Sequence, residues 1–214
     1  MPYRKTEGGR TMETNMNMHF DFEMNQFDGR VLHNLTNLLF SYGELINHAT
    51  GSCFQVQKTL IRLLAQQSAE DSAETFLQTL CAHDAVYGAG IIGVEFSADR
   101  VRIAGFPQAS DMATLKAFGQ LAVLIVKYCR ECTRVIARQR EITNERFSMR
   151  GLLVALGMNG PAFKESRSIL LRHLQGNSSY CSQASAERAA EKYRLARAAR
   201  EVKPRGQIIY EYIE

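Results

Sequence analysis

Polar and apolar residues alternate near the beginning of the chain and then recur at helical spacing. Within residues 19–24, Phe20 and Phe22 share one side of the chain and polar residues take the other, which predicts a half-buried strand. Asp28 can cap a helix whose apolar residues recur every three or four positions until about Gly51. The pattern therefore predicts a strand followed by a long amphipathic helix.

The same patterns, with the glycines and prolines that interrupt them, divide the rest of the chain into helices and one hairpin. Further helices are expected at about 54–66, 70–82, 111–139, 144–156, 161–174 and 185–201. Further strands are expected at 91–96, 101–103 and 207–213. This order predicts an α+β fold. A small antiparallel sheet, made of the N-terminal strand and the hairpin, is packed by helices, and the C-terminal half is mainly helical.

Length and composition favour one globular domain with an extension at each end. The 214 residues have room for one sizeable core. We expect a polar, disordered arm at 1–17, a single α+β domain at 18–181, and a basic helical extension with a terminal strand at 182–214. The longest apolar runs, such as Leu121–Val126, are far shorter than the roughly 20 residues of a membrane span. Five cysteines, an odd number, favour a reducing compartment, the cytoplasm.

Charge is distributed unevenly between the two halves of the chain. Residues 1–108 carry 8 Lys and Arg against 12 Asp and Glu, a net charge of −4, whereas residues 109–214 carry 18 against 10, a net charge of +8. This asymmetry favours a polyanion as partner of the second half, or two oppositely charged faces that meet in a homo-oligomer.

A basic stripe is expected on the predicted helix 111–139. Its cations are three and four residues apart, so they cover about 80° of the helix circumference, opposite the apolar side. Neighbouring cations on one face repel each other, which favours a compensating phosphate backbone or acidic residues from the first half. A merely solvated face is the alternative. The stripe consists of Lys127, Arg130, Arg134 and Arg138.

Two arginines fall on apolar faces of the next two predicted helices. Arg150 and Arg167 are each flanked by apolar residues at helical spacing, and a buried arginine needs a partner because an unpaired buried charge costs several kcal/mol. One interpretation is structural, with bonds to helix carbonyls or to an acid. The other is that both converge with Lys164 on an anion beside the loop 176–179, because guanidinium groups and backbone N–H groups bind phosphate well.

The extension at 182–214 adds further cations that could follow a phosphate backbone, although an Ala-rich basic helix is also a common spacer. Those that we assign to the candidate surface are Arg194, Arg197 and Arg200. The two helices joined by the turn 157–160 also allow a helix-turn-helix interpretation. The second of them carries few polar side chains for bases, which favours a simple helical hairpin.

A series of residues between 134 and 180 carries a family resemblance: Arg134-Val135, Asn144–Phe147, Arg150, Leu152-Leu153, Leu156–Met158, Gly160, Phe163-Lys164, Arg167, Leu170-Leu171, Leu174 and Gly176–Tyr180. In these residues the chain resembles an uncharacterised family from bacteriophages and integrative elements, whose members are often labelled "virulence-related protein". The similarity is weaker from about His19 onward and excludes residues 182–214. The family's aromatic strand is reduced here to Phe106-Pro107, and the chain has no Trp. The resemblance implies a mobile-element setting and little about chemistry.

Signals of catalysis, metal binding or cofactor binding are weak. Cys129 and Cys132 have the spacing of a redox or metal pair, but both fall on the apolar side of the predicted helix, and no second Cys or His pair completes a zinc site. The five histidines have no metalloprotease spacing, and no phosphate-binding or nucleophile motif occurs. We therefore expect a protein without catalytic residues, metal or cofactor.

These observations lead to two hypotheses of different classes. The first is a non-enzymatic, nucleic-acid-associated accessory protein of a phage or mobile element, which binds phosphate backbone through a basic helical face. The second is a protein-interaction module or an inhibitor of a host defence or nucleic-acid-processing protein, whose basic face docks an acidic protein surface. Only the first predicts binding to arbitrary DNA or RNA.

Overall fold

The computed structural model describes residues 18–67, 72–139 and 141–201. The predicted arm at 1–17 and the predicted strand at 207–213 lie outside the described residues.

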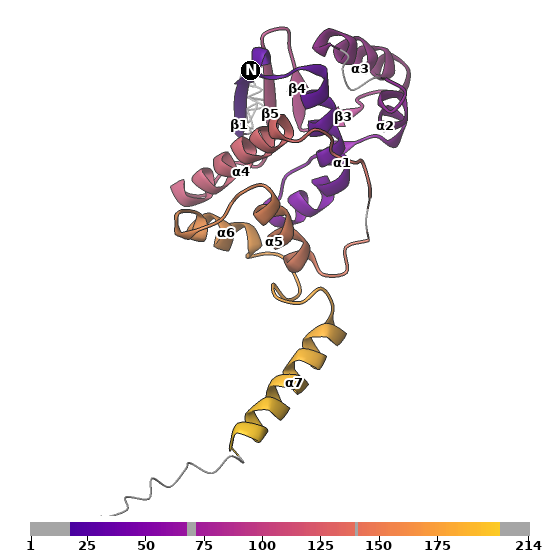
Figure 1. Cartoon of the computed structure of the whole chain (residues 1–214). Coiled ribbons are helices and arrows are strands. Elements are labelled where there is room, and N and C mark those ends of the chain that lie inside the picture. The colour runs from indigo at the N-terminus through magenta and orange to yellow at the C-terminus, as the bar shows by residue number, and fades with distance from the viewer. Residues whose placement is uncertain (1–17, 68–71, 140, 202–214) are drawn as a thin grey trace, which may run out of the picture.

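The fold is α+β, as predicted, with a three-stranded and a two-stranded antiparallel sheet among helices (Figure 1). Its elements are β1 (Met18–Glu23), a 3-10 turn η1 (Met24–Gln26), α1 (Gly29–Thr50), β2 (Gln55–Val56), α2 (Lys58–Leu64), α3 (Ala73–Tyr87), β3 (Ile91–Ile92), β4 (Val94–Phe96), β5 (Arg100–Phe106), α4 (Met112–Glu131), α5 (Glu145–Ala155), a 3-10 turn η2 (Pro161–Phe163), α6 (Lys164–Leu171) and α7 (Gln183–Glu201).

Helix α1 forms the centre of the fold. Its predicted start and end are confirmed: Asp28 Oδ1 accepts a hydrogen bond from Val31 N at 2.7 Å, and Gly51 ends the helix with a left-handed φ of 73°. More than half of its 22 residues are buried. Helices α2, α3, α4 and α5 all contact it, so α1 offers a face to nearly every other part of the core.

The three-stranded sheet has the order β1-β5-β4, with both pairs antiparallel. The predicted alternation in β1 is confirmed, because Phe20 and Phe22 are half-buried while the intervening residues are exposed. Phe20 and Val94 both lie opposite Ile103 of β5. The sheet therefore contributes one apolar face to the core and leaves a polar face outside.

Several element boundaries differ from the sequence prediction. The first strand of the predicted hairpin is divided into β3 and β4, and β3 pairs with β2, a short strand that falls inside the predicted helix 54–66. Helix α3 continues to Tyr87, five residues past its predicted end. Helix α6 ends at Leu171 instead of Leu174. Gln55 and Val56, which the predicted helix 54–66 included, instead pair their backbone with Ile92 and Ile91 of β3.

The largest difference concerns the long helix, predicted at 111–139. Helix α4 ends at Glu131, and residues 132–139 are not helical. By length and a mean hydropathy of 1.3, α4 could cross a membrane, but here seven of its residues are buried and it packs against α1 and α6. It is therefore a core helix in this fold.

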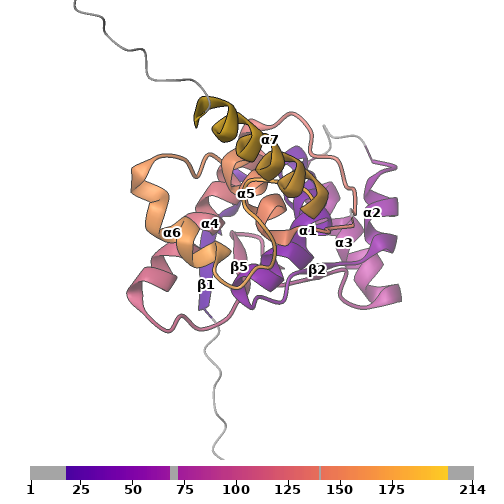
Figure 2. The ribbon, with the colours of Figure 1, turned by 90° about the horizontal axis from the view of Figure 1, so that it is seen from below.

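Helices α5 and α6 form a hairpin beside α1 and α4, and α7 projects from the fold beyond them (Figures 1 and 2). Asn144 caps α5 by accepting a hydrogen bond from Phe147 N at 3.0 Å, close to the predicted helix start at 144, and Pro161 occupies the first turn of η2. The described side chains of α7 are largely exposed, including Tyr193 at 72%. Among these described side chains of α7, none is buried.

Candidate nucleic-acid interface

Two polar side chains of α1 determine where α4 ends. Arg30 Nη1 donates hydrogen bonds to the carbonyl oxygens of Arg130, at 3.2 Å, and Cys132, at 2.7 Å. Asn34 Nδ2 donates to the carbonyl oxygens of Cys129, at 3.0 Å, and Cys132, at 2.9 Å. The last carbonyls of a helix have no partner within the helix. Here α1 supplies those partners from about a hundred residues earlier in the chain.

The chain after α4 is held along the same side of α1. We call residues 132–138 the tethered segment. Asn34 Oδ1 accepts a hydrogen bond from Val135 N at 2.8 Å, and Asn37 Nδ2 donates to Val135 O at 2.9 Å. Further on, Ser41 Oγ donates to Ile136 O at 3.1 Å and accepts from Arg138 N at 2.9 Å. The backbone is thus bonded at 132, 135, 136 and 138.

Side chains of the tethered segment alternate between the core and the surface. Val135 and Ala137 are half-buried, whereas Arg134, Ile136 and Arg138 are exposed, Ile136 at 73%. The segment therefore directs an Arg-Ile-Arg series away from α1 while its backbone is fixed from behind.

The predicted basic stripe is wrong as a single helical face. Lys127 and Arg130 lie on α4, but Arg134 and Arg138 lie on the tethered segment. Lys127 Nζ is 3.7 Å from a carboxylate oxygen of Glu131, and Arg130 Nη1 is 3.4 Å from the amide oxygen of Gln26. Within the described parts of the chain, the guanidinium groups of Arg134 and Arg138 have no ion pair or hydrogen bond. All four cations are exposed.

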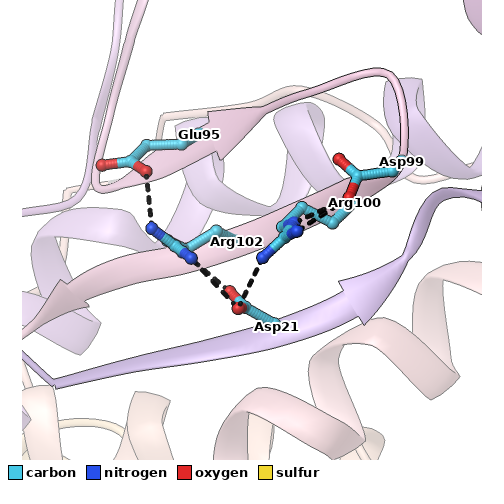
Figure 3. Close-up of polar contacts among 5 residues, drawn as sticks. All are labelled: Asp21, Glu95, Asp99, Arg100 and Arg102. Atoms are coloured by element: carbon cyan, nitrogen blue, oxygen red, sulfur yellow. Dashed lines mark hydrogen bonds and ion pairs between the residues drawn. The ribbon is translucent and has the colours of Figure 1, made fainter.

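The arginines on the outer face of the sheet, unlike Arg134 and Arg138, are paired with carboxylates (Figure 3). Arg102 pairs with Asp21 at 2.8 Å and with Glu95 at 3.7 Å. Arg100 pairs with Asp99 at 2.8 Å and with Asp21 at 3.6 Å. The hydrogen bond from Arg102 lowers the pKa of Asp21 below its ordinary value. These cations already have carboxylate partners and are poorly suited to bind a further anion.

The two arginines predicted on apolar faces bond to carbonyl groups of different loops. Arg150 is exposed, contrary to the prediction that it faces the core, and its Nη1 donates to Ser178 O at 3.1 Å. Arg167 is half-buried, and its Nη1 donates to Met158 O at 3.0 Å and Gly160 O at 2.9 Å. Lys164 is exposed near the start of α6. These contacts favour the structural interpretation over convergence on one anion.

The loop 176–179 uses its polar groups internally. Asn144 Nδ2 donates to Asn177 O at 3.0 Å and Tyr180 O at 2.6 Å, and Ser179 N donates to Asn177 Oδ1 at 2.7 Å. Arg146, which the sequence analysis gave no role, donates to Leu171 O at 3.1 Å and so caps the end of α6. The loop is therefore organised by side chains of α5 and its cap.

Sequence reasoning also missed the polar edge of α1, which we define as Arg30, Asn34, Asn37 and Ser41. The signal was present, because these residues are four, three and four positions apart and so form one stripe on a helix whose other faces are largely apolar. Asn34 is 2% exposed. A buried asparagine within a helix requires hydrogen-bond partners from elsewhere in the fold.

The Cys129–Cys132 pair and His83 have their reactive groups within the core or in closed contacts. Burial raises the pKa of the Cys129 thiol, and a hydrogen bond with Cys132 together with burial raises the pKa of Tyr128 to about 12. His83 is buried, with Nε2 2.8 Å from Thr59 Oγ1 and Nδ1 3.3 Å from Asp84 Oδ1. Among the described residues, no group of three or more His, Cys, Asp or Glu could hold a metal ion.

The predicted cations of the extension lie on α7. Arg194 pairs with Glu191 at 2.8 Å, Arg197 also has an interaction partner, and Arg200 belongs to the last turn of the helix. We found no matching family model, curated protein or solved structure for this chain. The resemblance to the phage and integrative-element family stays a prediction.

Proposed function

We propose that this protein binds the phosphate backbone of a nucleic acid, without sequence preference and without catalysis, through the end of α4 and the tethered segment. The main observation in support is that Arg134 and Arg138 are exposed and unpaired among the described residues. Both guanidinium groups are exposed, have no acidic partner among the described residues, and extend from a backbone that α1 holds in place.

The local charge supports this proposal. Residues 127–139 contain four cations and one acid, Glu131. Nucleic-acid phosphates attract such a surface, and the released counterions make the affinity depend strongly on salt. On α7, Arg194 is already paired with Glu191, so we expect the phosphate contacts mainly from α4 and the tethered segment. The setting in a phage or integrative element rests only on the resemblance over residues 134–180.

The test is a fluorescence titration of labelled duplex and single-stranded DNA and RNA at about 50 and about 200 mM salt. The wild-type protein should bind all of them at low salt and lose most of its affinity at the higher salt. The variant Arg134→Ala/Arg138→Ala should bind duplex DNA roughly 60-fold more weakly at about 0.1 M salt, because each lost phosphate contact removes about 0.9 from the slope of log affinity against log salt.

A charge-matched control is available at the other end of α4. Lys116 and Arg172 are both exposed. Lys116 lies near the start of α4, about 20 Å along the helix from the tethered segment, and Arg172 lines a cavity between α6 and the start of α4. The variant Lys116→Ala/Arg172→Ala changes the net charge equally but should change binding little. Equal losses in the two double variants would contradict a localised site, and no binding by the wild type at low salt would contradict the proposal itself.

A second candidate function is favoured by Ile136, which is 73% exposed between the two arginines. An exposed apolar side chain on a fixed backbone can anchor a protein partner, and the arginines would then meet acids on that partner. This candidate predicts no binding to arbitrary nucleic acid, and it predicts that Ile136→Ser weakens association with the partner as strongly as loss of an arginine.

A further inference from the structure

We infer that Asn34 is a positioning residue of the proposed nucleic-acid interface, because it both ends α4 and fixes the backbone that carries Arg134 and Arg138. This inference rests on the proposed function. It adds a residue that cannot touch the nucleic acid itself, since Asn34 is 2% exposed.

Asn34 uses its amide group almost completely. Its two donors reach Cys129 O and Cys132 O, and its acceptor receives Val135 N. These three bonds bridge the last turn of α4 and the first part of the tethered segment. A side chain without these groups would leave Cys129 O and Val135 N without these partners, whereas Cys132 O would keep its bond from Arg30 Nη1. The chain can relieve this loss by rearranging.

The direction of that rearrangement follows from the sequence. Residues 132–139 have the spacing of a continuing amphipathic helix, and they contain neither Gly nor Pro. Without Asn34, Cys129 O can regain a donor if α4 continues by one turn and Thr133 N donates to it in the i+4 pattern. Arg134 and Arg138 would then move away from the positions that α1 gives them.

Helix α1 offers a matched control. Asn47 also makes three hydrogen bonds to a neighbouring segment: Nδ2 donates to Phe54 O at 2.7 Å, and Oδ1 accepts from Ser52 Oγ at 2.8 Å and from Phe54 N at 2.8 Å. It holds the chain before β2 and contacts no cation of the interface. Asn47→Ala therefore removes a comparable set of bonds from the same helix without releasing the tethered segment.

The experiment compares duplex DNA binding and its salt dependence for the wild type, Asn34→Ala and Asn47→Ala, each with and without Arg134→Ala/Arg138→Ala. We expect Asn34→Ala to lower affinity by most of the roughly 60-fold effect of the arginine pair at about 0.1 M salt. In the Asn34→Ala background the arginine substitutions should then cost little more. Asn47→Ala should keep the wild-type affinity and the full effect of the arginine pair.

A milder variant covers the case in which Asn34→Ala fails to fold. Ser41→Ala removes the bonds to Ile136 O and Arg138 N and a local bond to Asn37 O within α1. It should lower affinity by up to the roughly eightfold effect of one phosphate contact. Amide exchange of Arg138 N–H should become faster in the same variant.

The outcomes separate the two levels of the proposal. Normal binding by both Asn34→Ala and Ser41→Ala, with the arginine pair still required, would overturn the positioning role and leave the proposed function intact. Equal weakening by Asn34→Ala and Asn47→Ala would also overturn it, because general loss of stability would then explain the effect. If the wild type binds no nucleic acid at low salt, both fail.

Discussion

Substitution of Gly176 by alanine tests the organisation of the loop 176–179 at its tightest point. Gly176 has φ of 96°, and a Cβ built there would lie 2.3 Å from Asn144 Oδ1 and 2.8 Å from Asn144 Cγ. Asn144 is 8% exposed and is held by bonds to Phe147 N, Asn177 O and Tyr180 O. It cannot move aside without losing them.

The magnitude follows from two separate costs. A left-handed backbone costs an alanine about 1–2 kcal/mol. Displacing Asn144 adds the loss of a helix N-cap, about 1 kcal/mol, and about 1–3 kcal/mol for buried polar groups left without partners. After the gain of up to about 1 kcal/mol from a stiffer unfolded chain, we expect Gly176→Ala to lower the free energy of unfolding by roughly 3–5 kcal/mol.

Gly157 provides the control, because it has φ of 82° but no atom within 4 Å of an added Cβ. Gly157→Ala should cost only the backbone strain, about 1 kcal/mol after the gain from a stiffer unfolded chain. Urea unfolding followed by circular dichroism measures both variants, and with a slope of about 2 kcal/mol per M their midpoints should differ by about 1–2 M. Equal costs in the two variants would refute the close approach of Gly176 to Asn144.

Two further predictions concern side chains that bridge elements. Arg167→Ala should lower the free energy of unfolding by about 1–3 kcal/mol through loss of the bonds to Met158 O and Gly160 O; a fully stable variant that no longer binds nucleic acid would instead support an anion-binding role. Glu145 accepts from Gln175 N and lies 2.7 Å from His48 Nδ1, and the His48 contact lowers the Glu145 pKa below its ordinary 4.5. A carboxylate whose pKa is lower in the folded state than in the unfolded state stabilises the fold at any pH above the unfolded-state pKa, and this stabilisation is lost as the pH falls through the folded-state pKa. In urea unfolding, the stability advantage of wild type over Glu145→Gln should therefore shrink below about pH 4.5.

Local signals allowed the sequence to predict most element boundaries in the first helix and in α5. Asp28 and Asn144 are caps whose side chains bond to N–H groups three residues later, and Gly51 takes a left-handed φ at the end of α1. Each of these signals depends only on residues within a few positions. That is why they could be read without knowing the tertiary structure.

The end of α4 could not be predicted in this way. The residues that end it, Arg30 and Asn34, are 95 to 102 positions away from the carbonyls that they bond. Within 132–139 the local pattern still favours a helix, so tertiary hydrogen bonds override propensity there. The same override explains the candidate site: the sequence identified Arg134 and Arg138 as candidates, but it placed them on a helix face that does not exist.

Neutral side chains hold the tethered segment, and this choice has an electrostatic consequence. Asn34, Asn37 and Ser41 fix the backbone through amide and hydroxyl groups, so they add no negative charge beside Arg134 and Arg138. The outer face of the sheet shows the opposite arrangement, where carboxylates both orient the arginines and neutralise them (Figure 3). An aspartate in place of Ser41 could still accept the hydrogen bond from Arg138 N, but its charge would reduce the attraction of the segment for a polyanion. A cation that is already paired must lose its carboxylate partner before it can bind a phosphate, and this loss weakens binding. A phosphate-binding surface therefore benefits when its cations are held in place by neutral groups.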